Sequence, residues 1–422
     1  MAKIWTKSNQ EETTDAKTFC EFTTGNDYQL DQTYFFEYDI EASKVWAQAI
    51  RDCGIYTEDE CKFVTASLDT ILVSYRNGGI RVEPEDEDCH TTIEKWLTKL
   101  TGDLGKKIHT GRSRNDQSLT MVRMFMRKAL SEISSHATTL NSNIFKRSDK
   151  WGFNKPFIGY SHTQQAMPIT IGHYFSSFAE SLKDDSMILS NARSIINKCP
   201  LGTGAGFGSP LNIDRIVISD DLGFGEFINN SLYAQNTRGK YELVYLQAMS
   251  QVMLTLQRMA SDMILYTSRE FGLFKMSDSL SQGSSMMPQK KNPDVFEIIR
   301  AKAADVLSLE ERVKLIIKGL PSGYNRDLQE IKACVVDAYN ITKNCLYIMN
   351  LAIEHIEPDH DMIAKKLEKD IVAADYIISK CVEDPELNFR DLYKDFMEDN
   401  YMSLKPEDAL RLRKSKGSPN NL

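Results

Sequence analysis

One polar segment combines hydroxyls, lysines and a helix-start signal in a way that favours an anion-binding site. Residues 283–294 read GSSMMPQKKNPD, so Lys290 and Lys291 directly precede Asn292 and Pro293. An asparagine followed by proline is typical of an N-cap and a first helical residue. The helix N-terminus already favours anions, so two lysines there need a negative ligand. The alternative is that Asn292 only caps the helix and that solvent surrounds the lysines.

A second basic segment, HTGRSRNDQ over 109–117, precedes another predicted helix. Arg112 and Arg114 flank the helix start, and Asn115 or Asp116 is the expected cap. Guanidinium groups bind carboxylates and phosphates through paired hydrogen bonds. The alternative is that one arginine pairs with a structural acid such as Asp116. Two basic segments at two helix starts favour a small ligand with several negative charges.

Two more segments supply titratable and hydrogen-bonding groups. His162, within YSHTQQ over 160–165, is a candidate general acid or base, and we expect this cluster to open a long helix. Tyr324, Gln329 and Lys332 are expected on one side of another helix start. The alternatives are a structural histidine and a simple capped helix.

Familiar metal and nucleotide motifs are missing from the sequence. The glycine-rich run 202–208 has Phe207 where a dinucleotide fingerprint needs glycine, and HExxH and GxSxG do not occur. We therefore expect no metal and no cofactor.

Composition narrows the class of protein. The 422 residues, net charge of −8 and 41% hydrophobic content indicate a soluble globular protein of roughly three domains. The negative charge disfavours a general nucleic-acid or anionic-membrane binder. No stretch has the apolar length of a secretory signal or a membrane span. Eight cysteines without CxxC spacing favour reduced thiols, and so a cytoplasmic protein.

Long helices are expected to position these segments. From Tyr241 to Glu270, apolar residues recur every three or four positions without proline or glycine. Similar patterns predict helices over 117–147, 164–197, 294–318 and 327–355. The fold class is therefore mainly α, with an extended central bundle that other subunits complete. We expect an N-terminal domain over 1–108, the bundle over 109–356 and a small helical domain over 357–422.

These motifs resemble a known enzyme family. GSSMMPQKKNPD is similar to the signature of the fumarase/aspartase superfamily, and HTGRSRNDQ together with EFGLFKMSDSLSQ (270–282) resembles its argininosuccinate lyases. The resemblance extends over most of 85–335. It implies a three-domain, mainly α fold with a long central bundle, and a homotetramer whose active sites combine loops of three subunits. It also implies the elimination of fumarate from argininosuccinate to give arginine, a step of arginine biosynthesis.

The resemblance also implies residue roles. Ser284 would be the base that removes the Cβ proton, and Lys290 and Asn292 would hold the neighbouring carboxylate. His162 would act as an acid or proton relay. The implied substrate-binding residues are Ser113, Arg114, Asn115, Ser161, Arg238, Tyr324, Gln329 and Lys332. Proton removal would create a dianionic aci-carboxylate, and a fixed donor is worth about 3–4 kcal/mol in comparable sites.

The sequence departs from the family pattern in three places. Residue 161 is serine where threonine is usual, which keeps the hydroxyl. The segment FTTGNDYQLDQ (22–32) does not match the usual serine-containing stretch, so no binding residue is assigned there. The region beyond residue 356 is not aligned.

Three competing functions remain at this point. They are an adenylosuccinate lyase-like elimination, a non-catalytic crystallin-like structural protein and a carboxylate-binding regulatory protein. HTGRSRNDQ disfavours the first, and the presence of Ser284, Lys290, Asn292 and His162 favours catalysis over the other two.

Overall fold

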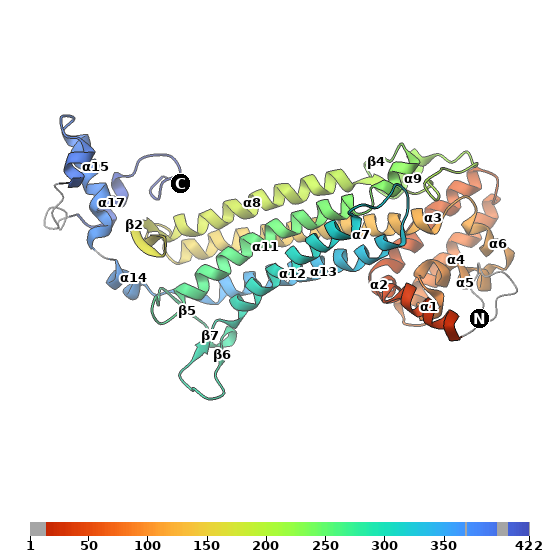
Figure 1. The fold of residues 1–422 in the computed structure, drawn as a ribbon, viewed down its shortest axis with the longest axis horizontal. Coiled ribbons are helices and arrows are strands. Elements are labelled where there is room, and N and C mark those ends of the chain that lie inside the picture. The colour runs from red at the N-terminus through yellow and green to blue at the C-terminus, as the bar shows by residue number, and fades with distance from the viewer. Residues whose placement is uncertain (1–13, 368, 395–403, 422) are drawn as a thin grey trace. The chain divides into compact units, whose positions relative to one another are not determined.

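The computed structural model describes residues 14–367, 369–394 and 404–421, which are predominantly helical (Figure 1). The mainly α expectation is therefore confirmed. The chain divides into two compact units. Unit 1 comprises Met1–Ile133, Ile188–Ser250 and Asp305–Ile341, and unit 2 comprises Ser134–Met187, Gln251–Ala304 and Thr342–Leu422. The division at residues 108 and 356 stays a prediction. None of the described helices combines the length and apolar character that a membrane crossing requires.

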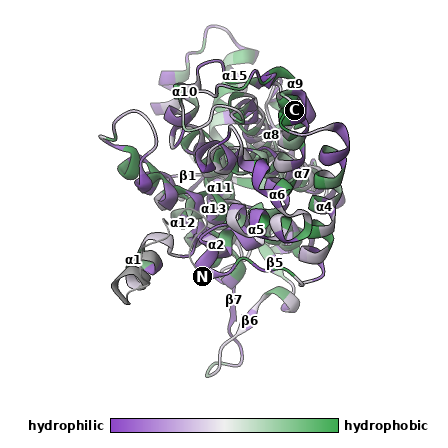
Figure 2. Ribbon diagram, turned by 90° about the vertical axis from the view of Figure 1, so that its right-hand side faces the viewer, coloured by the Kyte–Doolittle hydropathy of each residue, from purple (hydrophilic) through white to green (hydrophobic). Residues whose placement is uncertain are grey.

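Five long helices contribute residues to both units. They are α7 (Arg114–Lys150), α8 (Ile171–Ile196), α11 (Lys240–Tyr266), α12 (Asp294–Ile317) and α13 (Ile331–Glu354). Along α11, Leu246, Met249, Met253 and Leu256 are fully buried, as the helical period requires. Figure 2 shows hydrophobic and hydrophilic residues together on the long helices. Four of the five predicted helices match within a few residues.

In unit 1, segments of α7, α11, α12 and α13 pack against one another. The Arg123 guanidinium of α7 lies 4.6 Å from the centre of the Tyr241 ring of α11. The Ser250 hydroxyl of α11 donates to Glu310 of α12 over 2.7 Å. Tyr339 of α13 donates to Glu132 of α7 over 2.6 Å. These contacts hold the unit 1 segments of the four helices together as one bundle.

Shorter elements complete unit 1. Thr57 and Glu60 form a capping box at the start of α4, and Asp88 caps α5. Trp46 of α3 is fully buried. The elements are α1 (Thr14–Thr24), α2 (Asp27–Leu30), a π-helical turn (Asp31–Phe35), α3 (Phe36–Asp52), α4 (Glu58–Arg76), α5 (Cys89–Thr101), α6 (Asp103–Lys106), α9 (Arg215–Asp221), α10 (Ser231–Asn236) and the parallel pair β3 (Lys198–Cys199) and β4 (Glu226–Phe227). Three short 3₁₀ turns are Pro84–Asp86, Lys107–His109 and Arg326–Glu330.

In unit 2, the remaining segments of the long helices pack together. The Asn141 amide of α7 donates to the Ala179 carbonyl of α8 over 3.0 Å, and Tyr174 of α8 donates to Asp262 of α11 over 2.9 Å. The further elements are β5 (Phe274–Met276), β6 (Gln282–Gly283), β7 (Lys291–Asn292), β8 (Ile356–Pro358), α14 (His360–Lys366), α15 (Ala373–Glu383), α16 (Phe389–Lys394) and α17 (Pro406–Leu412), with 3₁₀ turns at Asp278–Leu280 and Lys369–Val372. β5 pairs with β8, and β6 with β7, both antiparallel.

The expected helix over 164–197 is wrong in its first turns. Gln164–Thr170 forms β2, which pairs antiparallel with β1 (Pro156–Ser161). Pro168 disfavours helical backbone in the residue before it, which explains the extended conformation. The Thr170 hydroxyl accepts from the His173 amide over 3.0 Å, so the helix begins only at Ile171.

Candidate active site

A pocket of about 170 Å³ in unit 1 collects six of the predicted substrate-binding residues. Arg114, Asn115, Arg238, Tyr324, Gln329 and Lys332 line it. The other lining residues are Thr24, Asp27, Glu87, Asp88, His90, Ser118, Val122, Glu242, Arg326, Leu328 and Ile331. Segments far apart in the sequence therefore meet at one surface that is rich in guanidinium, ammonium and carboxylate groups.

The start of α7 positions Arg114 and Asn115, although its cap differs from the expected one. The Ser113 hydroxyl accepts from the Asn115 amide over 3.2 Å, and the Ser113 amide donates to Asp116 over 2.8 Å. Ser113 is therefore the cap, in place of Asn115 or Asp116. Ser113, a predicted binding residue, is not among the described residues that line the pocket.

Asp116 joins this helix start to the glycine-rich run. One of its oxygens accepts from the Gly202 and Gly204 amides over 3.0 and 2.9 Å. Burial raises the pKa of Asp116 to about 6, although its three amide hydrogen bonds act in the opposite direction. The glycine-rich run thus serves to hold the start of α7.

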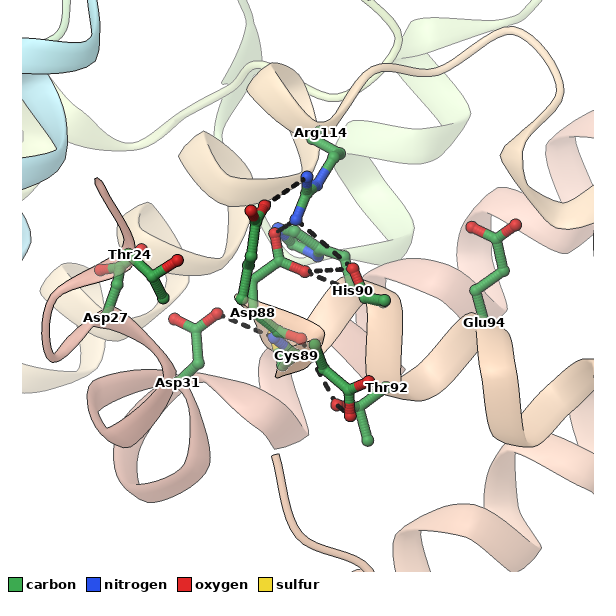
Figure 3. A network of polar contacts seen from close by, with 12 residues as sticks. Thr24, Asp27, Asp31, Asp88, Cys89, His90, Thr92, Glu94 and Arg114 are labelled. Atoms are coloured by element: carbon green, nitrogen blue, oxygen red, sulfur yellow. Dashed lines mark hydrogen bonds and ion pairs between the residues drawn. The ribbon is translucent and has the colours of Figure 1, made fainter. Parts of the chain in front are cut away.

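Arg114 is held by acids that precede α5. It forms ion pairs with Asp88 and, over 3.4 Å, with Glu87 (Figure 3). Burial opposes the charged form of Asp88, but His90 and Arg114 outweigh it and lower the pKa of Asp88. The Asp88 carboxylate also accepts from the Thr91 amide over 2.9 Å. The guanidinium is therefore oriented at the pocket wall before any ligand arrives.

Arg238 connects two other predicted residues. Its Nη2 donates to the Asn115 carbonyl over 2.5 Å, and its Nε donates to Gln235 over 3.1 Å. The guanidinium lies 5.1 Å from the centre of the Tyr324 ring, within the range of a cation–π interaction. Arg238 thus fixes the pocket wall between α7 and the 324–332 segment.

The N-terminal segment closes another side of the pocket. Lys332 contacts carboxylate oxygens of Asp27 and Asp31, each over 2.8 Å. Gln329 donates to the Thr23 carbonyl over 3.0 Å, and Arg326 donates to the same carbonyl over 2.9 Å. A segment to which the sequence assigned no role therefore touches two of the predicted binding residues.

His90 belongs to a buried group with Asp39 and Cys89. The ligand-type atoms of these three residues lie within 4.8 Å of one another. His90 Nδ1 lies 2.9 Å from an Asp39 oxygen. Burial disfavours the imidazolium, but the neighbouring carboxylates outweigh it and raise the pKa of His90. Burial also raises the pKa of the Cys89 thiol. Cys53, Cys61, Cys89, Cys199, Cys334, Cys345 and Cys381 are free thiols.

Ser161 and His162 lie in unit 2, at the tip of the β1–β2 hairpin. Both side chains are exposed. The expectation that this cluster opens a helix is wrong, because the segment forms a hairpin. His162 and Thr163 have positive φ values of 51° and 62°, as in the tight turns of two-residue hairpins. The hairpin therefore projects the histidine from a strained turn.

Ser284, Lys290 and Asn292 lie on a second hairpin of unit 2, formed by β6 and β7. The Ser284 hydroxyl accepts from the Met286 and Met287 amides over 3.3 and 3.0 Å. Asn292 lies in β7 and is not the helix cap as expected. The Pro293 carbonyl accepts the first helical bonds of α12, so Pro293 takes the cap position, and the helix begins at Asp294, where the predicted range begins.

The comparisons with known proteins identify the family of this chain. The lyase family matches residues 14–308. An argininosuccinate lyase of Thermotoga neapolitana is 36% identical over 373 residues, which cover 88% of this chain and 93% of the relative. One of Bacteroides thetaiotaomicron is 39% identical over 363 residues, which cover 85% of this chain and 80% of the relative. The chain belongs to the argininosuccinate lyase family.

Solved structures support the fold of this family member. An EDDS lyase in complex with formate has a TM-score of 0.78 at 21% identity and covers 94% of this chain and 86% of its own. A class II fumarase from Schistosoma mansoni has a TM-score of 0.73 at 14% identity and covers 92% of this chain and 94% of its own. The fumarase/aspartase-like fold is thereby confirmed.

Sequence reasoning missed several pocket residues of this argininosuccinate lyase family member, among them Asp27, Asp88 and His90. Asp88 had a recognisable signal, because an aspartate directly before the first residue of a helix, three positions ahead of Thr91, suits an N-cap. Asp27 had no such signal, because its partner Lys332 lies 305 positions away in the sequence.

Proposed function

We propose that this protein eliminates fumarate from argininosuccinate and releases arginine. Family membership supports this reaction, and the observation that carries it is the convergence of six predicted binding residues on the unit 1 pocket. The substrate carries three carboxylates and two cationic groups. A pocket lined by arginines, a lysine and acids offers partners for both signs of charge.

Ser284 is proposed as the base that removes the Cβ proton. Two amides donate to its hydroxyl oxygen, and such donors favour the anionic form of an oxygen. Lys290 and Asn292 are proposed to hold the carboxylate next to the reacting carbon, where negative charge accumulates. His162, exposed at its hairpin tip, is proposed to supply or relay the proton for the departing arginine, and Ser161 beside it to bind substrate.

The proposed assembly is a cytoplasmic homotetramer whose active sites combine loops of different subunits. Exposed apolar side chains on the long helices support association with further copies. These side chains are Met187, Ile188, Ile195, Leu254, Leu265, Ile298, Leu315 and Tyr347. The three-domain division with boundaries at residues 108 and 356 is part of this proposal.

Fumarate absorbance tests the reaction directly. Purified protein is offered argininosuccinate and adenylosuccinate separately, and release from argininosuccinate alone is expected. Ser284→Ala should abolish turnover and leave the mass of the assembly unchanged. Release from neither substrate by an intact wild-type assembly would favour a non-catalytic, crystallin-like protein, and full activity of Ser284→Ala would reassign the base.

A further inference from the structure

Two aspartates share one lysine at the N-terminal side of the pocket, and they do so unequally. Asp31 is fully buried, and its second oxygen accepts from the Cys89 amide over 3.0 Å. Figure 3 shows this Asp31–Cys89 bond. Asp27 lines the pocket and is only partly buried. Asp31 is therefore fixed as the permanent partner of Lys332, whereas Asp27 remains open to a ligand.

The charges at this corner do not balance. One ammonium faces two carboxylates, each 2.8 Å away. Burial raises the pKa of Asp27 against the effect of Lys332, and the neighbouring Asp31 raises it further. A second cation at Asp27 would relieve this excess of negative charge.

A carboxylate and an ammonium in hydrogen-bond contact match a particular ligand group. An α-amino-acid head carries a carboxylate and an ammonium on one carbon, so the two can bind adjacent groups of opposite charge. Asp27 can accept from the ligand's ammonium while Lys332 donates to its carboxylate. Asp31 keeps Lys332 charged and in place during this exchange, because its own contacts do not depend on Asp27.

We propose that Asp27 determines specificity by pairing with the α-ammonium of the arginine half of the substrate, beside Lys332, which takes the α-carboxylate. This inference rests on the proposed function and deepens it, because it assigns one substrate end to one corner of the pocket. Adenylosuccinate has no α-amino-acid head in its nucleotide half, so this corner would also discriminate between the two substrates.

Binding of the product to the full protein tests the assignment by calorimetry, independently of turnover. The ligands are L-arginine, 5-guanidinopentanoate, which lacks the α-ammonium, and agmatine, which lacks the α-carboxylate. The variants are Asp27→Asn, Asp27→Glu and a matched control, Asp69→Asn, on the exposed face of α4. Thermal midpoints establish that each variant is folded.

The wild type should bind arginine about tenfold or more tightly than 5-guanidinopentanoate, the usual scale for a charged hydrogen bond. Asp27→Asn should remove that preference by weakening arginine and agmatine, which both carry the ammonium, and not 5-guanidinopentanoate. Asp27→Glu should restore part of the preference, and Asp69→Asn should change nothing.

Other results would overturn the assignment. If Asp27→Asn weakens arginine and 5-guanidinopentanoate equally, Asp27 acts only by holding Lys332 or contacts the guanidinium. In that case, an equal weakening of agmatine binding would show that Asp27 contacts the guanidinium, which all three ligands carry. No measurable binding of arginine to the wild type also overturns the proposal. Fumarate release by the same wild-type protein shows separately whether the proposed reaction holds.

Discussion

Tyr324 brings two separable groups to the pocket at the residue scale, an aromatic ring and a hydroxyl. The ring lies beneath the Arg238 guanidinium, which also bonds to the Asn115 carbonyl. Removal of the ring should therefore disturb the arrangement of the pocket, whereas removal of the hydroxyl should remove only a hydrogen bond to substrate.

We expect Tyr324→Phe to raise the KM for argininosuccinate about tenfold, the scale of one hydrogen bond to a charged group, with an unchanged thermal midpoint. Tyr324→Ala should raise KM further, because Arg238 loses its aromatic partner. Steady-state kinetics on both variants provide the measurement. Wild-type KM in Tyr324→Phe would show that the hydroxyl does not touch substrate.

Local motifs in the sequence name single residues that the structure places at the pocket, whereas contacts between distant positions have no such signal. Arg114 and Lys332 were named by local motifs, and both line the pocket. The Asp27–Lys332 pair joins positions 305 apart, so only the folded chain reveals it. His90 was missed because its partner Asp39 lies on a different helix.

At the scale of elements, periodicity predicted the long helices well, since α11 ends only four residues before its expected end at Glu270. The hairpin of β1 and β2 was missed because a short polar stretch before Pro168 fits a helix start as well as a turn. The positive φ angles at its tip depend on strand pairing, which local sequence does not specify.

The strained hairpin turn yields a test of how His162 is held. Thr163 has a φ of 62°, which costs a β-branched residue about 1–2 kcal/mol. Thr163→Gly should relieve this strain and keep or raise the thermal midpoint, yet lower kcat about tenfold because the turn becomes mobile. Thr163→Asn, which tolerates this backbone, should keep most activity. Wild-type kcat in Thr163→Gly would show that a rigid turn is not needed.

A buried carboxyl group between α8 and α11 in unit 2 should make the stability of the protein depend on pH. Asp185 is buried and accepts from the Thr255 hydroxyl over 2.7 Å. Burial raises its pKa from 3.8 to about 6. The folded state thus binds this proton more tightly than the unfolded state, so the stabilisation present below pH 4 is lost as pH rises through 6.

Asp185→Asn stays neutral and should escape this loss. We expect it to exceed the wild type in stability at pH 8 by up to about 3 kcal/mol, and by much less at pH 5. Thermal midpoints at the two pH values provide the measurement, with Glu180→Gln at an exposed position of the same helix as the matched control. An equal difference at both pH values would contradict the raised pKa.

At the scale of the whole molecule, the predicted site residues divide between the two units. Arg114, Asn115 and Lys332 belong to unit 1, whereas His162 and Ser284 belong to unit 2. The sequence could name both sets but not how copies of the chain combine them, because association depends on side chains spread over several helices. If each active site draws its sets from different subunits, two inactive variants can restore one another.

Mixed assemblies of Asn115→Ala and Ser284→Ala test this arrangement. Each variant alone should release almost no fumarate. Co-assembled in equal amounts, they should recover up to about a quarter of wild-type activity, because random mixing gives that share of sites two intact contributors. Native mass spectrometry establishes that mixed oligomers have formed. If they have formed and activity stays at the level of the separate variants, each site is built within one chain, and the proposal of shared sites fails.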